Sequence, residues 1–266
     1  LFKLDENRKP YVVAGVPPDY FSQTGQRWGN PIYRWDILKE KGYPWWTQRI
    51  AHNLTLFDLV RIDHFRGLVG FWEIPAAEKT AVIGKWVQAP ALDFFNHLVK
   101  EFPGLPVIAE DLGIITPDVR EVMDHFHFPG MKVLVFAFGP GLPANPYIPH
   151  NFSNHCVAYT GTHDNNPVKG WFEKEASPDD QKRLFRYLGR NVPPGELPHE
   201  LIRLLMMSVA DTVILPMQDV LGLGAEARMN YPSTREGNWE WRLASDLLTP
   251  QVAAKLREMT EIYGRS

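Results

Sequence analysis

The chain has 266 residues, of which 44% are hydrophobic, and this is enough for one large core or two modest ones. Its formal net charge of −3 does not favour nucleic acid or an anionic membrane, and no apolar run is long enough to span a bilayer. The single cysteine, Cys156, excludes an internal disulfide and a cysteine zinc site, and it favours a reducing, cytoplasmic compartment.

Strands and helices alternate along the chain. The predicted strands lie at residues 59–63, 106–110, 131–138, 156–160 and 213–217. The predicted helices lie at 45–60, 90–102, 177–190, 199–210 and 249–263, and a further helix begins at Thr116, where Thr, Pro and Asp occur together. Alternating strands and helices predict a parallel sheet.

The spacing of these five strands leaves long loops after them, which is typical of a (β/α)8 barrel with its site at the strand ends. A doubly wound open sheet is the alternative. That fold favours a glycine-rich phosphate loop after an early strand, and the sequence shows no such loop. The predicted fold class is therefore α/β, with a (β/α)8 barrel preferred.

Three carboxylate segments each close a short apolar run: Arg61-Ile62-Asp63-His64, Ala109-Glu110-Asp111 and Thr162-His163-Asp164-Asn165. The carboxyl ends of parallel strands meet at one edge of a sheet, so these acids are expected to converge. Glycoside chemistry needs such a set: a nucleophile, a proton donor and a group that stabilises the distorted sugar.

Arg61 and Asp63 are two residues apart on a strand, so both side chains are expected on one face. A guanidinium beside a carboxylate favours the ionised form, which a nucleophile needs. The alternative is a buried Arg–Asp pair that holds two strands together. His64 is expected to face away unless the strand has already ended.

Glu110 follows the apolar residues Val107, Ile108 and Ala109. Burial and a nearby anion would both raise the pKa of this carboxyl group, as a general acid requires. If the carboxyl groups of Asp63 and Glu110 lie about 5–5.5 Å apart, a retaining mechanism through a covalent intermediate becomes possible. The alternative is a Glu that caps a helix or forms a salt bridge, and Asp111 is expected to be a structural hydrogen-bonding residue.

His163 and Asp164 follow a turn-forming Thr-Gly-Thr sequence and could hydrogen-bond sugar hydroxyls. The histidines show no pair spaced by four on a helix face, so a metal site is not expected.

Residues 15–33 are rich in glycine and proline, which indicates a loop. Its aromatic and amide side chains suit a sugar-binding loop, although the same aromatics could lie tucked beneath it. The aromatic residues are Tyr20, Phe21, Trp28 and Tyr33, and the hydrogen-bonding residues are Asp19, Gln26 and Asn30.

Five segments occur in this order: GVPPDYFSQTGQRWGNPIY, RIDHFRG, AEDLG, TGTHDN and MNYPSTREGNWEWR. Together they resemble the amylomaltase family, the 4-α-glucanotransferases or disproportionating enzymes, which are retaining members of the α-amylase superfamily. The resemblance runs from about Ala14 to Arg242. It implies an enzyme that cuts an α-1,4-glucan and transfers one piece to the 4-hydroxyl of another.

The resemblance implies Asp63 as nucleophile, Glu110 as acid/base and Asp164 as transition-state stabiliser. It implies that Arg61, His163, Gln26, Trp28 and Asn230 contact sugar, and that Tyr20 and Phe21 belong to a flexible loop over the acceptor side. Malto-oligosaccharides or starch-type glucan are the implied substrates, and no cofactor is implied.

The resemblance also implies that residues 1–36 form the aromatic loop and the end of an inserted subdomain. Residues 37–266 would then be the C-terminal part of the barrel, with its fourth to eighth strands. An N-terminal half of the same protein is the expected partner. An α-glucan hydrolase and an inactive glucan-binding fragment are the alternative functions.

Overall fold

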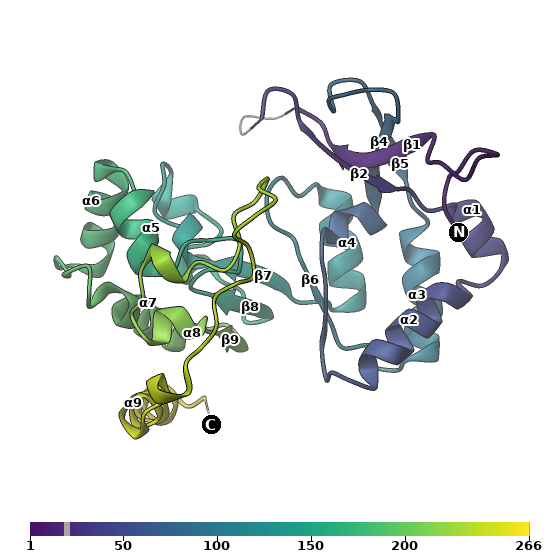
Figure 1. The fold of residues 1–266 in the computed structure, drawn as a ribbon. Coiled ribbons are helices and arrows are strands. Elements are labelled where there is room, and N and C mark those ends of the chain that lie inside the picture. The colour runs from purple at the N-terminus through teal and green to yellow at the C-terminus, as the bar shows by residue number, and fades with distance from the viewer. Residues whose placement is uncertain (19–21, 266) are drawn as a thin grey trace. The chain divides into compact units, whose positions relative to one another are not determined.

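The computed structural model describes residues 1–18 and 22–265, which form two compact units, residues 1–130 and residues 131–266 (Figure 1). Each unit has its own sheets and helices. Within the described ranges, every helix is too short or too polar to cross a bilayer.

The N-terminal unit contains an antiparallel sheet that the sequence did not predict. Its strand order is β2 (Gln26–Pro31), β1 (Val12–Val16), β4 (Gly70–Pro75) and β5 (Lys85–Gln88). Gly15 is required where β1 lies against β2, because a Cβ atom there would be 2.1 Å from the carbonyl oxygen of Gln26.

The prediction of a loop over residues 15–33 was therefore wrong in part, because β1 ends in this stretch and β2 lies within it. β2 is an edge strand whose side chains are mostly exposed. An edge strand need not show alternating apolar residues, so hydrophobic periodicity does not detect it.

Four helices pack against this part of the chain: α1 (Trp35–Glu40), α2 (Pro44–Leu54), α3 (Ala91–Glu101) and α4 (Pro117–Phe126). The predictions for 90–102 and for a start at Thr116 are confirmed, whereas the helix predicted over 45–60 ends at Leu54. Phe57, one of the apolar residues on which that prediction rested, lies beyond the helix and is exposed.

A phenylalanine cluster fills the core of this unit. The ring of Phe95 on α3 is fully buried and lies 5.2 Å from the rings of both Phe65 and Phe128. Phe65 directly follows the first predicted carboxylate segment, so this cluster fixes α3 beneath the strand that carries Asp63.

Two short parallel strands lie above this core, β3 (Val60–Ile62) and β6 (Val107–Ala109). Their register pairs Val60 with Val107 and Ile62 with Ala109. The parallel pairing predicted for these two segments is confirmed.

The C-terminal unit has a three-stranded sheet in the order β7 (Gly130–Val133), β8 (Cys156–Tyr159) and β9 (Thr212–Ile214). β8 and β9 are parallel, as predicted. The strand predicted over 131–138 was too long, because a 3-10 turn over Leu134–Phe136 follows β7. Leu134, Ala137 and Phe138 are nevertheless fully buried, and an apolar run alone does not separate a buried strand from a buried turn.

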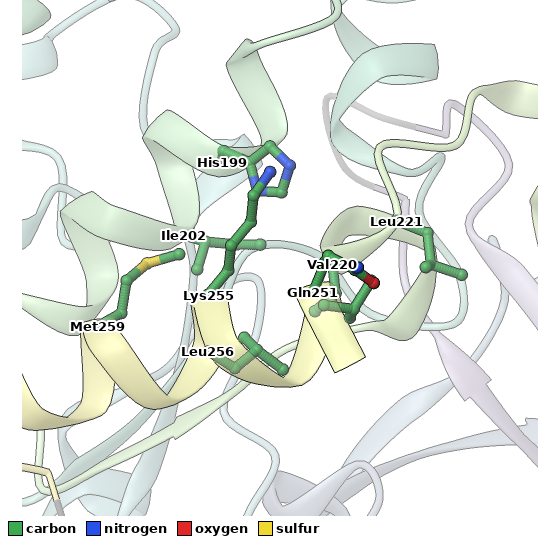
Figure 2. Close-up of a pocket in the computed structure, with 9 residues that line it drawn as sticks. His199, Ile202, Val220, Leu221, Gln251, Lys255, Leu256 and Met259 are labelled. Carbon is green, nitrogen blue, oxygen red and sulfur yellow. The ribbon is translucent and has the colours of Figure 1, made fainter. Parts of the chain in front are cut away.

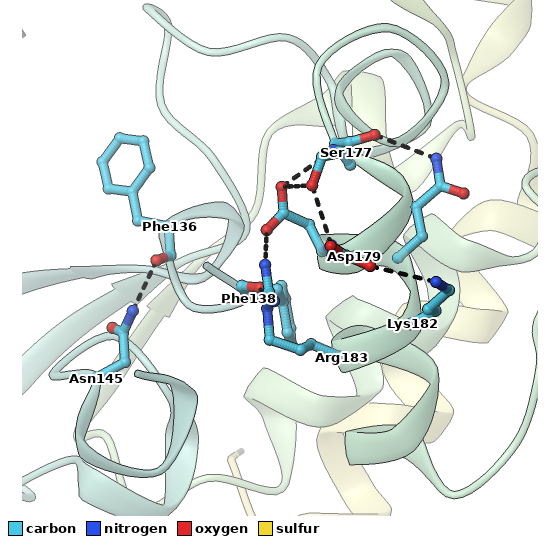
Figure 3. Close-up of polar contacts among 10 residues, drawn as sticks. Phe136, Phe138, Asn145, Ser177, Asp179, Lys182 and Arg183 are labelled. Carbon is cyan, nitrogen blue, oxygen red and sulfur yellow. Dashed lines mark hydrogen bonds and ion pairs between the residues drawn. The ribbon is translucent and has the colours of Figure 1, made fainter. Parts of the chain in front are cut away.

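Helices α5 (Val168–Lys174), α6 (Pro178–Leu188), α7 (Leu197–Met206) and α8 (Met217–Val220) accompany these strands. Ser177 is the N-cap residue of α6 and forms a reciprocal capping box with Asp180 (Figure 3). Arg183 of α6 also donates from Nε to the carbonyl oxygen of Phe138 at 2.8 Å, and this bond ties the turn after β7 to the helix.

α9 (Pro250–Ile262) covers α7 and α8 (Figure 2). Its residues Val252, Leu256 and Met259 pack on Ile202 and Val220. The helix predicted over 249–263 is confirmed. The helix predicted over 199–210 ends earlier, at Met206, where the hydroxyl of Ser208 donates to the carbonyl oxygen of Leu205 and closes the last turn.

Replacing Phe95 by alanine tests the phenylalanine cluster. The Phe95→Ala variant is expected to lose about 3–5 kcal/mol of unfolding free energy, because the ring is fully buried and the cavity would not collapse. Urea denaturation followed by circular dichroism measures this loss. Leu92→Ala is the matched control on the same helix, because Leu92 is 52% exposed and should cost less than about 1 kcal/mol. Equal losses in both variants would contradict the packing described.

Candidate active site

The predicted site residues form two clusters. Asp63 and Glu110 belong to the N-terminal unit, whereas Asp164 and Asn230 belong to the C-terminal unit. Each cluster has its own network of hydrogen bonds.

The register of β3 and β6 positions the first cluster. Ile62 pairs with Ala109, so the next residue along each strand is Asp63 and Glu110 respectively. The backbone bonds continue past the strand ends: Glu110 N–H donates to Ile62 O at 3.0 Å, and Phe65 N–H donates to Glu110 O at 3.2 Å. The two carboxylates therefore follow adjacent, hydrogen-bonded parallel strands, as the sequence predicts.

The Glu110 carboxylate is held by two backbone donors. The N–H of His64 donates to Oε2 at 2.7 Å, and the N–H of Leu112 donates to Oε1 at 2.8 Å. Burial raises the pKa of Glu110, and the charge of Asp63 adds to that effect, whereas the two N–H donors and Arg61 oppose it. The net direction is upward, as expected for a proton donor.

Asp63 lies in a contrasting environment. Its carboxylate forms an ion pair with Arg61 at 3.0 Å, and its side chain is 79% exposed. The alternative of a buried Arg–Asp pair that joins two strands therefore does not hold. An accessible anion stands beside a desolvated carboxyl group.

His64 is a residue whose role the sequence did not reveal. The strand ends at Ile62, and His64 adopts the left-handed conformation (φ 46°), which lets its N–H reach Glu110. Its ring stands edge-on to Trp28 with centroids 4.6 Å apart. Burial, with help from Arg66, lowers the pKa of His64 to about 4, so its ring is neutral at neutral pH.

Two of the residues predicted to contact sugar, Gln26 and Trp28, lie next to this arrangement. Trp28 lies on β2, and its indole N–H donates to Gln26 Oε1 at 3.1 Å. Because Trp28 packs on His64, both residues are connected to the peptide that binds Glu110. Tyr20 and Phe21 lie outside the described residues.

The second cluster is built around Asp164. Asn230 Nδ2 donates to Asp164 Oδ1 at 2.6 Å, and His163 Nε2 lies 3.5 Å from the same oxygen. The backbone N–H of Asn230 also donates to His163 O at 3.1 Å. The structure thus brings Asn230 to the adjacent residues His163 and Asp164, which lie far from it in sequence, and all three were predicted for one site.

Arg228 and Trp239 support this cluster and were not predicted. Arg228 Nη2 donates to the carbonyl oxygen of Asp164 at 2.7 Å, and its Nε donates to Asn230 O at 2.9 Å. The ring of Trp239 lies 5.2 Å from that of His163. Trp239 lies in the last of the five segments and Arg228 directly precedes that segment, and this nearness to Asn230 was the only sequence signal for them.

Asp219 fixes the loop that carries His163 and Asp164. It is fully buried, and its two carboxylate oxygens accept hydrogen bonds from the hydroxyl of Thr160 and from the N–H of Val168 at 2.7 Å. Thr160 directly follows β8, and Val168 begins α5, so one carboxylate spans the whole loop between them. Burial raises the pKa of Asp219 to about 6.

Among the described residues no cluster of three or more His, Cys, Asp or Glu side chains could hold a metal ion. The polar groups of both clusters are instead bonded mainly to protein donors. Their arrangement suits proton transfer and the binding of a hydroxyl-rich ligand.

Comparison with known proteins matches residues 1–249 to the family described as 4-alpha-glucanotransferase. The chain belongs to the 4-alpha-glucanotransferase family. The resemblance inferred from the five segments is thereby confirmed.

Named relatives in this 4-alpha-glucanotransferase family include the enzymes of Thermus thermophilus (52% identity) and Synechocystis (51% identity). Each alignment covers 99% of this chain but only 54% and 52%, respectively, of the relative. The chain therefore spans about half the length of the curated relatives it matches.

A solved structure agrees with this assignment. The amylomaltase of Streptococcus agalactiae, determined in complex with acarbose, has a TM-score of 0.93 and 40% identity over 99% of this chain and 53% of its own. The amylomaltase of Corynebacterium glutamicum is only 20% identical and shares the fold, with a TM-score of 0.78. The chain thus has the fold of about half of an amylomaltase.

Replacing Asp219 by asparagine tests the role of this buried carboxylate, which accepts hydrogen bonds from both ends of the Asp164 loop. Because the pKa of Asp219 is higher in the folded protein than in the unfolded chain, ionisation costs stability as the pH rises from about 4 to about 6. Asparagine does not ionise, and its amide can still accept from Val168 and donate to Thr160 Oγ. The stability of Asp219→Asn relative to the parent is expected to rise by about 1–3 kcal/mol between pH 4 and pH 7.

Urea unfolding at a series of pH values measures this difference. Asp179→Asn, at an exposed position on α6, is the control and should show a much smaller change with pH. A stability difference for Asp219→Asn that does not vary with pH would contradict the raised pKa.

Proposed function

We propose that this chain is the catalytic part of a 4-α-glucanotransferase that moves segments of α-1,4-glucan to a new 4-hydroxyl acceptor. The observation that carries the proposal is the contrast between the exposed, Arg61-paired Asp63 and the buried Glu110 on adjacent strand ends. Family membership supports the same reaction. The substrates are proposed to be malto-oligosaccharides or starch-type glucans.

The proposed reaction has two displacements. Asp63 attacks the anomeric carbon and forms a covalent ester while Glu110 donates its proton to the leaving oxygen. Glu110, now ionised, then removes the proton from an incoming 4-hydroxyl, whose oxygen attacks the anomeric carbon and displaces the Asp63 carboxylate. A water molecule in place of that hydroxyl would give hydrolysis instead.

Residues of both clusters have assigned roles in this proposal. Asp164, held by Asn230, accepts hydrogen bonds from sugar hydroxyls and strengthens them as the ring flattens. His163 contacts sugar hydroxyls, Arg61 holds the Asp63 carboxylate through their ion pair, and Gln26 and Trp28 bind sugar near Glu110. Tyr20 and Phe21 are proposed to cover the acceptor side.

The finer description of the fold belongs to the same proposal. We infer that the strands β3, β6, β7, β8 and β9 correspond to the fourth to eighth strands of a (β/α)8 barrel, with the rest supplied by an N-terminal part of the same protein. The coverage of about half of each relative is consistent with this inference. A cytoplasmic location, expected from the cysteine content, stays a prediction.

Incubation with maltotriose alone separates transfer from hydrolysis. A transferase is expected to produce glucose together with a ladder of sugars longer than maltotriose, because a second sugar replaces water as the acceptor. Chromatography of the products measures both. Products that are all shorter than maltotriose would support the hydrolase, and glucan binding without any turnover would support the inactive fragment.

Replacing Asp63 by asparagine tests the nucleophile. The Asp63→Asn variant is expected to lose at least about 10³-fold in kcat, because a neutral amide cannot form the covalent ester. Asp58→Asn is the control, since Asp58 is an exposed acid just before the same strand and should leave kcat unchanged. Near-normal turnover in Asp63→Asn would remove Asp63 from the mechanism.

A further inference from the structure

A groove of about 680 Å³ lies within the N-terminal unit, next to the peptides that hold Glu110. This volume lies within the range of roughly 300–1,000 Å³ that is typical of ligand pockets. Its lining includes Gln26, Trp28, His64, Arg66, Trp86 and Gln88. Trp28 and His64 belong to the cluster around Glu110, whereas Trp86 and Gln88 lie on β5 and have no role in the reaction described above.

The pleat of β5 explains why Trp86 and Gln88 line the groove together. Residues two apart on a strand point to the same face, so these two share a face while Val87 between them does not. Trp86 pairs with Trp72 of β4, and Gln88 pairs with Gly70. The Gln88 amide lies against Gly70, because a Cβ atom built there would be 3.4 Å from the Gln88 side-chain oxygen.

Two neighbouring side chains contact the Trp86 ring. The guanidinium of Arg66 lies 4.3 Å from the ring centroid, and the Trp72 ring stands edge-on at 5.4 Å. Trp86 still exposes 44% of its surface, as does Trp28. The groove thus presents two partly exposed indole rings, and the one at position 86 contacts Arg66 and Trp72.

The charges in the groove are already balanced. Arg66 Nη1 donates to the carbonyl oxygen of Ile114 at 2.8 Å, and its charge is opposed by that of Asp118, which also lines the groove. The ring of His64 is neutral at neutral pH because burial lowers its pKa. What remains is two indoles with amide and hydroxyl groups from Gln26, Gln88 and Thr116. This set fits a neutral ligand with apolar ring faces and many hydroxyl groups.

We propose that this groove binds a stretch of α-glucan chain beyond the sugars at the catalytic carboxylates, with Trp86 as the stacking platform and Gln88 as a hydrogen-bonding partner. The proposal rests on the function proposed above, because it takes the ligand class from that function. It adds a distinct consequence: long glucans gain contacts at Trp86 that short ones do not reach.

Binding of maltotriose and maltoheptaose by isothermal titration calorimetry tests this groove. The Asp63→Asn chain is the parent, so that the sugars are not consumed. Adding Trp86→Ala is expected to weaken maltoheptaose binding about tenfold and maltotriose binding less than twofold, since one stacking contact of about 1.4 kcal/mol is lost. Adding Gln88→Ala should weaken maltoheptaose binding several-fold. Tyr11→Ala is the matched control, because Tyr11 is an exposed aromatic residue of the same unit outside the groove.

Equal affinity of the Trp86→Ala chain and its parent for maltoheptaose would overturn the proposal that the groove binds glucan. An equal loss of affinity for maltotriose and maltoheptaose would also overturn it. Circular dichroism checks folding. If Trp86→Ala does not fold, the Trp86→Phe and Gln88→Ala chains take its place in the same titrations.

Failure of the proposed reaction can be distinguished from failure of the proposed groove. A chain with Asp63 intact that makes no transfer products, while Trp86 still discriminates maltoheptaose, refutes only the proposed reaction. If the chain with Asp63 intact makes transfer products but maltoheptaose binding does not depend on Trp86, only the groove proposal is refuted.

Discussion

The parallel pairing of β3 with β6 is the constraint on which the first cluster depends. Because Ile62 pairs with Ala109, the residues that leave the two strands are Asp63 and Glu110. A shift of one residue would reverse the faces of one strand and separate the two carboxylates. The phenylalanine cluster around Phe95 secures this register from below, through Phe65 on the chain that leaves β3. Core packing and the chemistry of the site therefore depend on the same few residues.

The two acids differ in environment although they are neighbours. Glu110 is desolvated and clamped by two backbone N–H groups, whereas Asp63 is exposed and paired with Arg61. The first arrangement favours a retained proton on Glu110 and the second leaves the Asp63 carboxylate accessible, which is the division of roles that a retaining mechanism needs. In the C-terminal unit a buried carboxylate, Asp219, has a purely architectural part, since it bridges the ends of the loop that bears Asp164.

Much of this could be predicted from the sequence. The parallel strands near 60, 108 and 158 follow from short apolar runs, and the raised pKa of Glu110 follows from its place at the end of one of them. The antiparallel sheet could not be predicted, because β2 is a polar edge strand and β5 has only four residues. His64 was expected to face away unless the strand had already ended; the strand ends at Ile62, and the left-handed backbone conformation of His64 brings its N–H, rather than its ring, to Glu110. Arg228 and Asp219 act through contacts with residues far away in sequence, which periodicity and local spacing do not encode.

The most direct test of the central claim is to locate the covalent intermediate. In the Glu110→Gln variant, an α-glycosyl fluoride can react with Asp63 because fluoride leaves without a proton donor, but the ester should persist because no base activates the acceptor. Intact-mass measurement and peptide mapping are expected to find one sugar increment on the peptide that contains Asp63. An increment on another carboxylate, or turnover at the parent rate with no increment, would contradict the assignment of these two acids.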